Sequence, residues 1–399
     1  MLPRRRDVTR LRRWSGLVLT GVLLAVCSTP GWTQPVPYEI EAILSLTGSG
    51  AFLGKASATA LSVVEQLVNK DGGIRGRPLK FVIADDQSTP AVAVQLLNGS
   101  IARHATVVMG SSLVGACNAM AALIPNGPVV YCFSGGMQPA KGSYMFAFGG
   151  NLLIQVPVSM RYLRARGLKK IAILATTDAS GKDGEHNVDL ALALPENRDM
   201  TIVDREYFSA GDVSISAQIA KIKASGAQAI TMWATGTNAG TAFRGMQDAG
   251  LDIPTVMSAA NAIGAQMKQY AALLPRDVYS AIPPCTVYDD LPNGPLKRAV
   301  GTFVAAFKAA GYEPDVPLAI GWDPGLIVAN ALRALGPDAT PAQLRDSISS
   351  LRGWSGASGD YDFRDGSQRG LTSNSMIMVR WDPTRSTFVA ISKLGGAPR

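Results

Sequence analysis

The chain has 399 residues, of which 47% are hydrophobic and 17% are charged, and its formal net charge at pH 7 is +8. This length suits two or three globular domains, and the apolar content excludes a disordered or fibrous protein. Residues 1–33 hold six arginines and one aspartate, so removing their net charge of +5 leaves +3 for the remainder. A basic surface of the kind that binds nucleic acid is therefore not expected, and nucleic acid is excluded as a partner.

The first 33 residues have the layout of a secretory signal peptide. An arginine-rich stretch at 4–13 precedes a predominantly apolar run of ten residues at 17–26, and small and polar residues follow. The apolar run is too short for a membrane span, which takes about 20 residues. We therefore expect cleavage near Thr33 and a periplasmic protein, with lipidation at Cys27 as the alternative.

From residue 37 the pattern alternates between strands and helices, which predicts parallel sheets with helices on both faces. In the first part, strands are expected at 38–46, 79–84, 106–109 and 129–133, and helices at 56–70, 90–102 and 117–124. The alternation restarts after Gly150. There, helices are expected at 154–166, 184–194, 213–225 and 239–249, and strands at 170–175, 202–207, 229–233 and 255–257.

The last part of the chain departs from this alternation. Residues 279–288 contain two adjacent prolines and read as a connecting strand. Helices follow at 295–311, at 324–335 and at 341–350, and Asp323 is the expected N-cap of the second of them. An antiparallel strand pair is expected within 375–391, around the turn at Asp382.

No catalytic or metal-binding pattern is present in the sequence. The two histidines have no metal-ligand spacing, and there is neither a nucleophile elbow nor a phosphate-binding loop. Gly48, Gly50 and Gly54 follow a strand, but their spacing differs from that of a dinucleotide-binding loop. We therefore expect no enzyme, no metal and no cofactor, and we expect these glycines to lie at the strand ends where α/β proteins bind ligands.

Three cysteines follow the predicted signal peptide. Cys117 begins a predicted helix and Cys132 ends the next predicted strand, which places both at one edge of the sheet. A disulfide and two buried thiols are both consistent with this placement. Cys285 has no evident partner.

Several motifs of the chain resemble the leucine/isoleucine/valine-binding family of periplasmic receptors that serve ABC transporters. The most specific is VNKDGGIRGRPLKFVIADDQSTPAVAV at 68–94. The other matching pieces are LTGSGAFLG at 46–54, VVMGSSLVGACNA at 107–119, KIAILATTDASGKDGE at 170–185, ANAIG at 260–264, GWDPGLIVANAL at 321–332 and GASGDYDF at 356–363. The resemblance covers nearly all of the chain after the signal peptide.

The resemblance implies the type I periplasmic binding fold, an α/β fold of two doubly wound Rossmann-like lobes joined by three hinge strands. The crossings are expected near 147–151, 281–286 and 355–360. Residues 37–149 with 285–356 would then form one lobe, and 150–284 with 357–399 the other. A monomer that closes around a small molecule and docks on an inner-membrane permease is implied. A ligand sensor that docks on a membrane signalling protein is the alternative.

The resemblance also implies which residues contact the ligand. Backbone N–H groups and hydroxyls of 111–116 would hold a carboxylate at the start of a helix. Phe52 and the second-lobe loops would complete the cleft. The predicted contact residues are Phe52, Ser111, Ser112, Val114, Gly115, Ala116, Ser134, Gly135, Gly136, Asp178, Ser180, Trp233 and Asn261.

The chain departs from the family's amino-acid binders at several ligand-contact positions, including the alanine-threonine pair that usually grips the ammonium group. Val114 stands where a serine is usual, and Gly135-Gly136 stand where an alanine-threonine pair is usual. The loop at 258–263 carries Asn261 and no acid, and Ser180 stands where an aromatic residue is usual. A buried ammonium without a carboxylate partner would cost several kcal/mol. An aromatic or aliphatic acid is therefore expected to fit at least as well as a branched-chain amino acid.

Overall fold

The computed structural model describes residues 35–209, 211–234 and 237–399, and for Ser180 the backbone alone. The predicted signal peptide at 1–33, with Cys27, lies outside these residues. Residues 36–399 form one compact unit. Across the described ranges, no helix combines the length and the apolar character that crossing a membrane requires.

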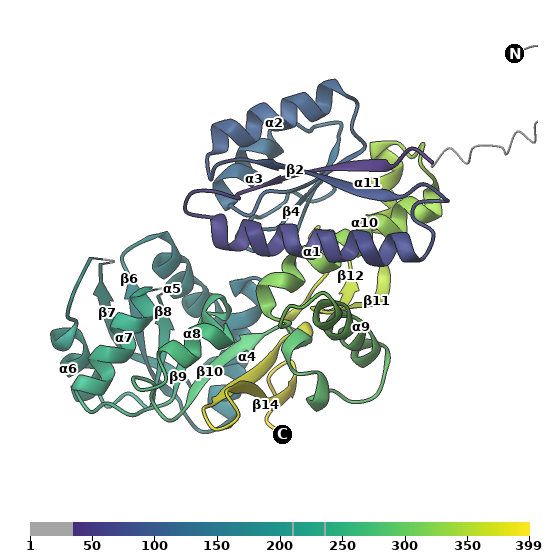
Figure 1. Cartoon of the computed structure of the whole chain (residues 1–399). Coiled ribbons are helices and arrows are strands. Elements are labelled where there is room, and N and C mark those ends of the chain that lie inside the picture. The colour runs from purple at the N-terminus through teal and green to yellow at the C-terminus, as the bar shows by residue number, and fades with distance from the viewer. Residues whose placement is uncertain (1–34, 210, 235–236) are drawn as a thin grey trace, which may run out of the picture. The chain divides into compact units, whose positions relative to one another are not determined.

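The N-terminal part of the chain forms a five-stranded parallel sheet with the order β2-β1-β3-β4-β5 (Figure 1). Its strands are β1 (Tyr38–Leu44), β2 (Leu79–Asp85), β3 (Val107–Gly110), β4 (Val129–Cys132) and β5 (Met145–Ala147), and its helices are α1 (Ala51–Lys70), α2 (Pro90–Ala102) and α3 (Val114–Ala121). Neighbouring residues of β1 enter different cores. Ile43 packs with residues of α2 and α3, whereas Ala42 belongs to the core that includes α1. Both faces of the sheet are thus covered, as parallel strands require.

A second, seven-stranded sheet has the order β14-β13-β10-β9-β8-β6-β7. The five strands β6 to β10 run parallel to one another, and β13 runs antiparallel to both of its neighbours, β10 and β14. The strands are β6 (Lys170–Thr176), β7 (Thr201–Phe208), β8 (Ala229–Trp233), β9 (Thr255–Met257), β10 (Val278–Ile282), β13 (Ile377–Asp382) and β14 (Thr387–Leu394). The accompanying helices are α4 (Leu152–Ala165), α5 (Ala179–Leu192), α6 (Ser216–Ala224), α7 (Thr237–Asp248) and α8 (Gly264–Gln269). These two sheets confirm the predicted α/β class.

Late elements of the chain pack on early ones. They are α9 (Pro295–Ala309), α10 (Val316–Leu335), α11 (Pro341–Ser349) and the hairpin of β11 (Arg352–Gly356) and β12 (Gly359–Asp362). The helix α10 lies along α1 (Figure 1), and a Cβ atom at Gly321 would come within 3.0 Å of the Cβ of Ala60. Short 3-10 helices are η1 (Pro195–Asn197), η2 (Ala259–Asn261), η3 (Pro284–Thr286), η4 (Tyr288–Asp290) and η5 (Ser373–Ser375). The division into two lobes with crossings near 147–151, 281–286 and 355–360 stays a prediction.

The start of α10 corrects the predicted N-cap. The helix begins at Val316 rather than at residue 324, and the side chain of Asp315 caps it by accepting from the N–H of Leu318 at 3.2 Å. Asp323 is instead a fully buried residue inside the helix. An aspartate followed by a proline is typical of a helix start, but here the apolar surroundings keep the chain helical through Pro324.

The predicted strand at 279–288 is also shorter than expected. The strand β10 ends at Ile282, and η3 and η4 follow it. Pro283 and Pro284 cause this early end, because neither has an N–H group to donate to a neighbouring strand.

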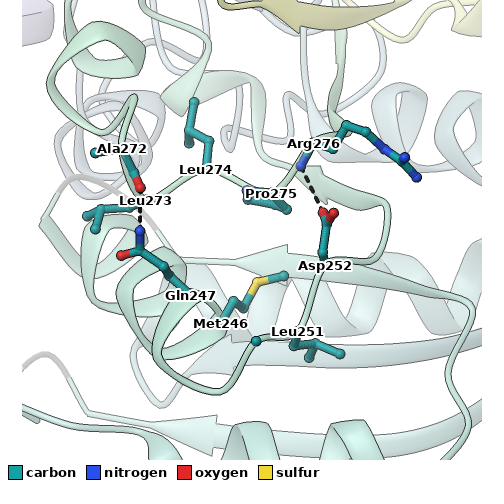
Figure 2. A pocket seen from close by; sticks show the side chains of 10 residues that line it. Met246, Gln247, Leu251, Asp252, Ala272, Leu273, Leu274, Pro275 and Arg276 are labelled. Carbon is teal, nitrogen blue, oxygen red and sulfur yellow. Dashed lines mark hydrogen bonds between the residues drawn. The ribbon is translucent and has the colours of Figure 1, made fainter.

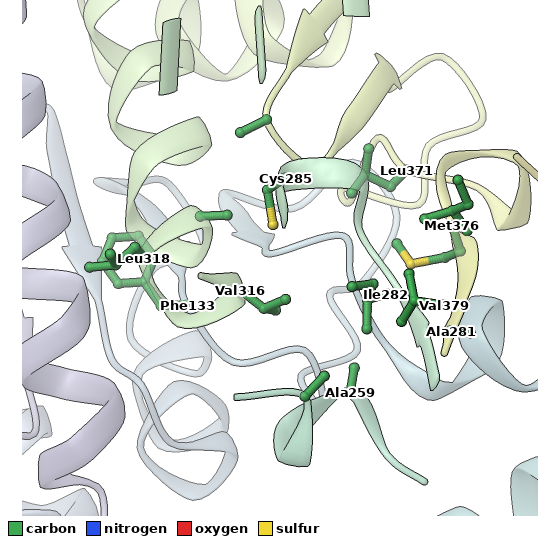
Figure 3. Close-up of a cluster of buried hydrophobic side chains, with 14 of the residues drawn as sticks. Phe133, Ala259, Ala281, Ile282, Cys285, Val316, Leu318, Leu371, Met376 and Val379 are labelled. Carbon is green, nitrogen blue, oxygen red and sulfur yellow. The ribbon is translucent and has the colours of Figure 1, made fainter. Parts of the chain in front are cut away.

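One continuous buried apolar cluster includes residues of both sheets and of the late elements. Figure 3 shows part of it, with Phe133 after β4, Ile282 of β10, Val316 and Leu318 of α10 and Val379 of β13. The cluster gives α10 an apolar environment on the sides that face these elements, which explains why the helix tolerates an internal proline.

Cys117 of α3 and Cys132 of β4 form a disulfide, with their Cα atoms 6.1 Å apart. The sequence was consistent with a disulfide and with two buried thiols, and the structure contains the disulfide. Cys285 is a buried free thiol in η3. The disulfide ties the helix after β3 to the end of β4.

Candidate functional site

A pocket of about 210 Å³ lies at the carboxyl ends of strands from both sheets. Loops that follow β3, β4, β9 and β10 contribute to it, together with the first turns of α1, α4 and α10. Its lining residues are Leu53, Ser112, Phe133, Ser134, Gly135, Gly136, Phe148, Gly150, Asn151, Leu152, Gln155, Asp183, Ser258, Ala259, Ala260, Pro283, Val316, Pro317 and Ile320. The carboxyl edge of parallel strands is where open α/β proteins bind ligands.

Most of the pocket wall is apolar. Phe133 and Phe148 are buried aromatic residues, and Leu152, Val316 and Ile320 add aliphatic surface from α4 and α10. An apolar wall with a few polar groups is typical of sites for small organic molecules. The wall suits an aliphatic or aromatic body.

Several polar groups of the pocket have no hydrogen-bond partner among the described residues. The hydroxyl of Ser112 and the Oδ1 atom of Asn151 are buried and unpaired. The N–H groups of Ser112, Gly135 and Gly136 also donate to no protein acceptor in this part of the chain. An unsatisfied buried polar group is unfavourable, so the Ser112 hydroxyl and the Asn151 Oδ1 atom would gain from a polar ligand or water. The N–H groups of half-buried Gly135 and exposed Gly136 are free to donate to the same ligand.

Two further polar residues come from helices of the second sheet. Gln155 of α4 is buried, and its side-chain amide forms no hydrogen bond with the described residues. Asp183 of α5 is exposed, and its Oδ1 atom accepts from Nδ2 of Asn187 at 3.0 Å. Among the described lining residues, Asp183 is the only one with a carboxylate.

A second pocket, of about 240 Å³, lies at the other edge of the second sheet (Figure 2). Two of its polar side chains are already paired. Gln247 donates to the carbonyl of Ala272, and the N–H of Arg276 donates to Asp252 at 2.9 Å. Asp252 precedes β9, so this pocket is at the amino ends of the strands. Position and pairing both favour the first pocket as the ligand site.

Residues 37–386 match the protein family described as periplasmic binding protein. The chain belongs to the periplasmic binding protein family. Because this is a family of binding proteins, the prediction that the chain is not an enzyme is confirmed.

A curated relative of this family member is the Leu/Ile/Val-binding protein homolog 3 of Brucella melitensis. The two are 25% identical over 235 residues, which is 57% of this chain and 63% of the relative. The match thus spans less than two thirds of the relative's length.

Solved structures of similar fold include two with bound ligands. A branched-chain amino acid transporter substrate binding protein from Streptococcus pneumoniae, in complex with isoleucine, is 19% identical and has a TM-score of 0.71, covering 89% of this chain and 97% of that one. A solute binding protein of an ABC transporter from R. palustris, in complex with benzoate, is 20% identical and has a TM-score of 0.70, covering 91% and 97%. These likenesses confirm the predicted type I periplasmic binding fold.

The structure of this periplasmic binding protein brings four predicted contact residues together in the pocket. They are Ser112 after β3, and Ser134, Gly135 and Gly136 after β4. Because β3 and β4 are neighbours in the sheet, their carboxyl ends meet at one edge. These four residues therefore share one edge of the sheet and line the pocket, and their role in holding a carboxylate stays a prediction.

Helix starts place several predicted residues outside the lining. Phe52 lies in the first turn of α1 and is 58% exposed, rather than in a loop over the ligand. Val114, Gly115 and Ala116 form the first turn of α3, and Ala116 is buried in the core. Ser180 belongs to the first turn of α5, and its side chain is not described. In each case the helix begins several residues before its predicted start, at positions that the apolar periodicity did not include.

Two other predicted residues hold local structure. The hydroxyl of buried Ser111 donates to Oδ2 of Asp86. Asp178 is the N-cap of α5, and its Oδ1 atom accepts from the N–H of Gly181 at 3.0 Å and from the hydroxyl of Thr176 at 2.8 Å. Neither lines the pocket.

Trp233 and Asn261 also lie outside the lining. Trp233 is buried, and a Cβ atom at Gly184 would come within 2.3 Å of its ring, so it packs closely on α5. Asn261 is buried in η2 and donates to the carbonyl of Ala234 at 2.6 Å. As ligand contacts, these residues remain predictions.

Sequence reasoning missed the lining residues from helices. Asn151 carried a signal, because an asparagine after two glycines and before an apolar-periodic segment is typical of an N-cap. Gln155, Asp183 and the α10 residues carried none. Only tertiary packing brings them to the pocket.

Proposed function

We propose that this protein is the periplasmic substrate-binding component of an ABC transporter, exported by residues 1–33. It captures a small carboxylate-bearing solute and delivers it to a permease in the inner membrane. The observation that carries this proposal is the combination, in one pocket, of an apolar wall with unpaired N–H and hydroxyl donors.

The donors suit a carboxylate. The hydroxyl of Ser112 and the N–H groups of Ser112, Gly135 and Gly136 come from two adjacent strand ends. The helix α3 begins two residues after Ser112, so its dipole adds positive potential there. Hydrogen bonds to an ionised acceptor are stronger than neutral ones, and each is worth roughly 1.5–3 kcal/mol.

Within this class, an aromatic or aliphatic acid without an ammonium group is favoured over a branched-chain amino acid. Asp183, the one described lining carboxylate, is exposed and already accepts a hydrogen bond. A buried ammonium needs a desolvated, well-placed carboxylate to offset its loss of hydration. The benzoate complex of the similar R. palustris protein is consistent with such a ligand.

A thermal-shift screen of the purified mature protein tests this proposal. The panel holds benzoate and 4-methylpentanoate as simple acids, leucine and isoleucine as amino acids, and glucose as a neutral control. We expect the simple acids to raise the melting temperature most, because they should bind most tightly. A ligand at 100 times its Kd stabilises the native state by about 2.7 kcal/mol. A panel in which no carboxylate shifts the melting temperature would contradict the proposal.

A further inference from the structure

Arg369, in the segment between β12 and β13, is a buried cation that forms no ion pair with any described acidic residue. The residue is 5% exposed, and it takes part in none of the ion pairs found among the described residues. Its Nη1 atom donates to the carbonyls of Gly135 and Phe148, at 3.0 and 3.1 Å. Its Nη2 atom is buried and unpaired in the described structure. A buried charge in this state is unfavourable unless something compensates it.

The two carbonyls that Arg369 holds belong to the pocket wall, because both Gly135 and Phe148 line the pocket. The Gly135 carbonyl and the Gly136 N–H share one planar peptide and point in opposite directions. The Gly136 N–H therefore points away from the guanidinium, and it has no acceptor in the described residues. Hydrogen bonds in series polarise one another, so Arg369 strengthens this N–H as a donor.

We propose that Arg369 is a positioning residue for the ligand's carboxylate: from behind the wall it fixes the two lining loops, and its uncompensated charge makes the pocket prefer anions over neutral molecules of the same shape. This inference rests on the proposed function. Burial lowers the pKa of Arg369 to about 10, so the side chain stays charged at pH 7. The bound carboxylate supplies a negative charge that none of the described acidic residues places in an ion pair with this guanidinium.

Binding measurements with acids and with amides of equal shape distinguish an effect of the Arg369 charge on the ligand from a purely structural role of Arg369. The probes are benzoate against benzamide, and 4-methylpentanoate against its amide, each titrated calorimetrically into the mature protein. We expect the wild type to bind each acid at least 100-fold tighter than its amide. Arg369→Met should weaken acid binding at least tenfold and amide binding less than threefold, and Arg369→Lys should keep most of the preference.

Arg364→Met is the matched control, because Arg364 lies five residues away, is exposed and pairs with Asp362. It should leave both affinities unchanged. If Arg369→Met does not fold, Arg369→Gln, which keeps a donor for the carbonyls without the charge, provides the same comparison.

Equal loss of acid and amide binding in the neutral variants, or an unchanged preference, overturns this inference while the proposed function stands. A wild type that binds neither acid overturns both. A preference that collapses in the neutral variants and survives in Arg369→Lys supports the role of Arg369.

Discussion

At the scale of single residues, two adjacent serines have opposite roles. The hydroxyl of Ser111 is buried and bonded to Asp86, which also accepts from the N–H of Ser88. The hydroxyl of Ser112 is buried, lines the pocket and has no partner among the described residues. Ser111 therefore stabilises the fold, whereas Ser112 is available for a ligand.

This difference predicts contrasting effects of two alanine substitutions. Ser112→Ala should weaken binding of a carboxylate ligand by about 10-fold, the equivalent of one hydrogen bond to a charged group, and leave the free energy of unfolding nearly unchanged. Ser111→Ala should lower the free energy of unfolding by roughly 1–3 kcal/mol, because it removes a buried donor to a carboxylate. Denaturant unfolding and calorimetry measure both. A stability loss in Ser112→Ala as large as that in Ser111→Ala would show that the two serines do not differ.

Asp183 provides a test of ligand charge. Asp183→Asn should leave benzoate affinity unchanged or raise it up to about fivefold, since the substitution removes a negative charge near an anionic ligand. Asp248→Asn is the control, because Asp248 is an exposed residue at the end of α7, away from the lining. A leucine affinity that exceeds that of benzoate in the wild type and is lost in Asp183→Asn would identify an ammonium partner and contradict the preference for simple acids.

At the scale of elements, α10 connects the pocket to the late hairpin. Its first turn lines the pocket, and its Asp323 accepts from the N–H groups of Ala357 and Ser358 at 2.7 Å and from the hydroxyl of Tyr361 at 3.0 Å. Burial raises the pKa of Asp323 above its ordinary 3.8, although these donors oppose the shift. One buried carboxylate thus fixes the turn between β11 and β12.

The raised pKa of Asp323 predicts a pH dependence of stability. The folded state binds the proton of the Asp323 carboxyl more tightly than the unfolded chain does. The protonated carboxyl therefore makes its full contribution to the free energy of unfolding below about pH 3.8, and this contribution is lost as pH rises through the folded pKa. Asp323→Asn should lower the free energy of unfolding by about 1–3 kcal/mol, and its deficit against the wild type should shrink between pH 4 and pH 7. Urea unfolding across that range measures it, with Asp289→Asn at an exposed site as control. A deficit that widens with pH would contradict the direction of the shift.

The disulfide that joins α3 to β4 closes a loop of 15 residues. A loop of this length corresponds to about 3 kcal/mol of stabilisation. The double variant Cys117→Ala/Cys132→Ala should lose roughly this amount in denaturant unfolding. Thiol titration of the unfolded, unreduced mature protein should find one free thiol, that of Cys285, and a count of three would show that the bond does not form.

The elements differ in how well the sequence predicts them. The strands β8 and β9 have the predicted bounds, because each is a short buried run between turn residues. Strand β5 was not predicted, since three residues are too few for a pattern. The helices α1, α3, α5 and α10 begin several residues before their predicted starts, because the apolar periodicity does not extend into their first turns. For this reason Phe52 and Val114, which were expected in loops, lie in the first turns of helices.

At the scale of the whole molecule, the alternating pattern and the resemblance predict the two-sheet fold, and the family match confirms it. The strand-end half of the pocket was predictable, because neighbouring parallel strands bring Ser112 and Gly135 to one edge. The part of the pocket that helices contribute was not predictable from the sequence. Gln155 and Asp183 reach the pocket through packing of distant segments, and Arg369 lies behind it through a loop more than 200 residues further along the chain.

The ligand that we propose for this pocket is a small carboxylate without an ammonium group. Calorimetric titration of the purified mature protein with benzoate and with leucine, at pH 7 and equal ionic strength, distinguishes such a ligand from an amino acid. We expect benzoate to bind at least tenfold more tightly than leucine, a difference of about 1.4 kcal/mol. Leucine binding tenfold more tightly than benzoate, with 4-methylpentanoate as weak as benzoate, would contradict it.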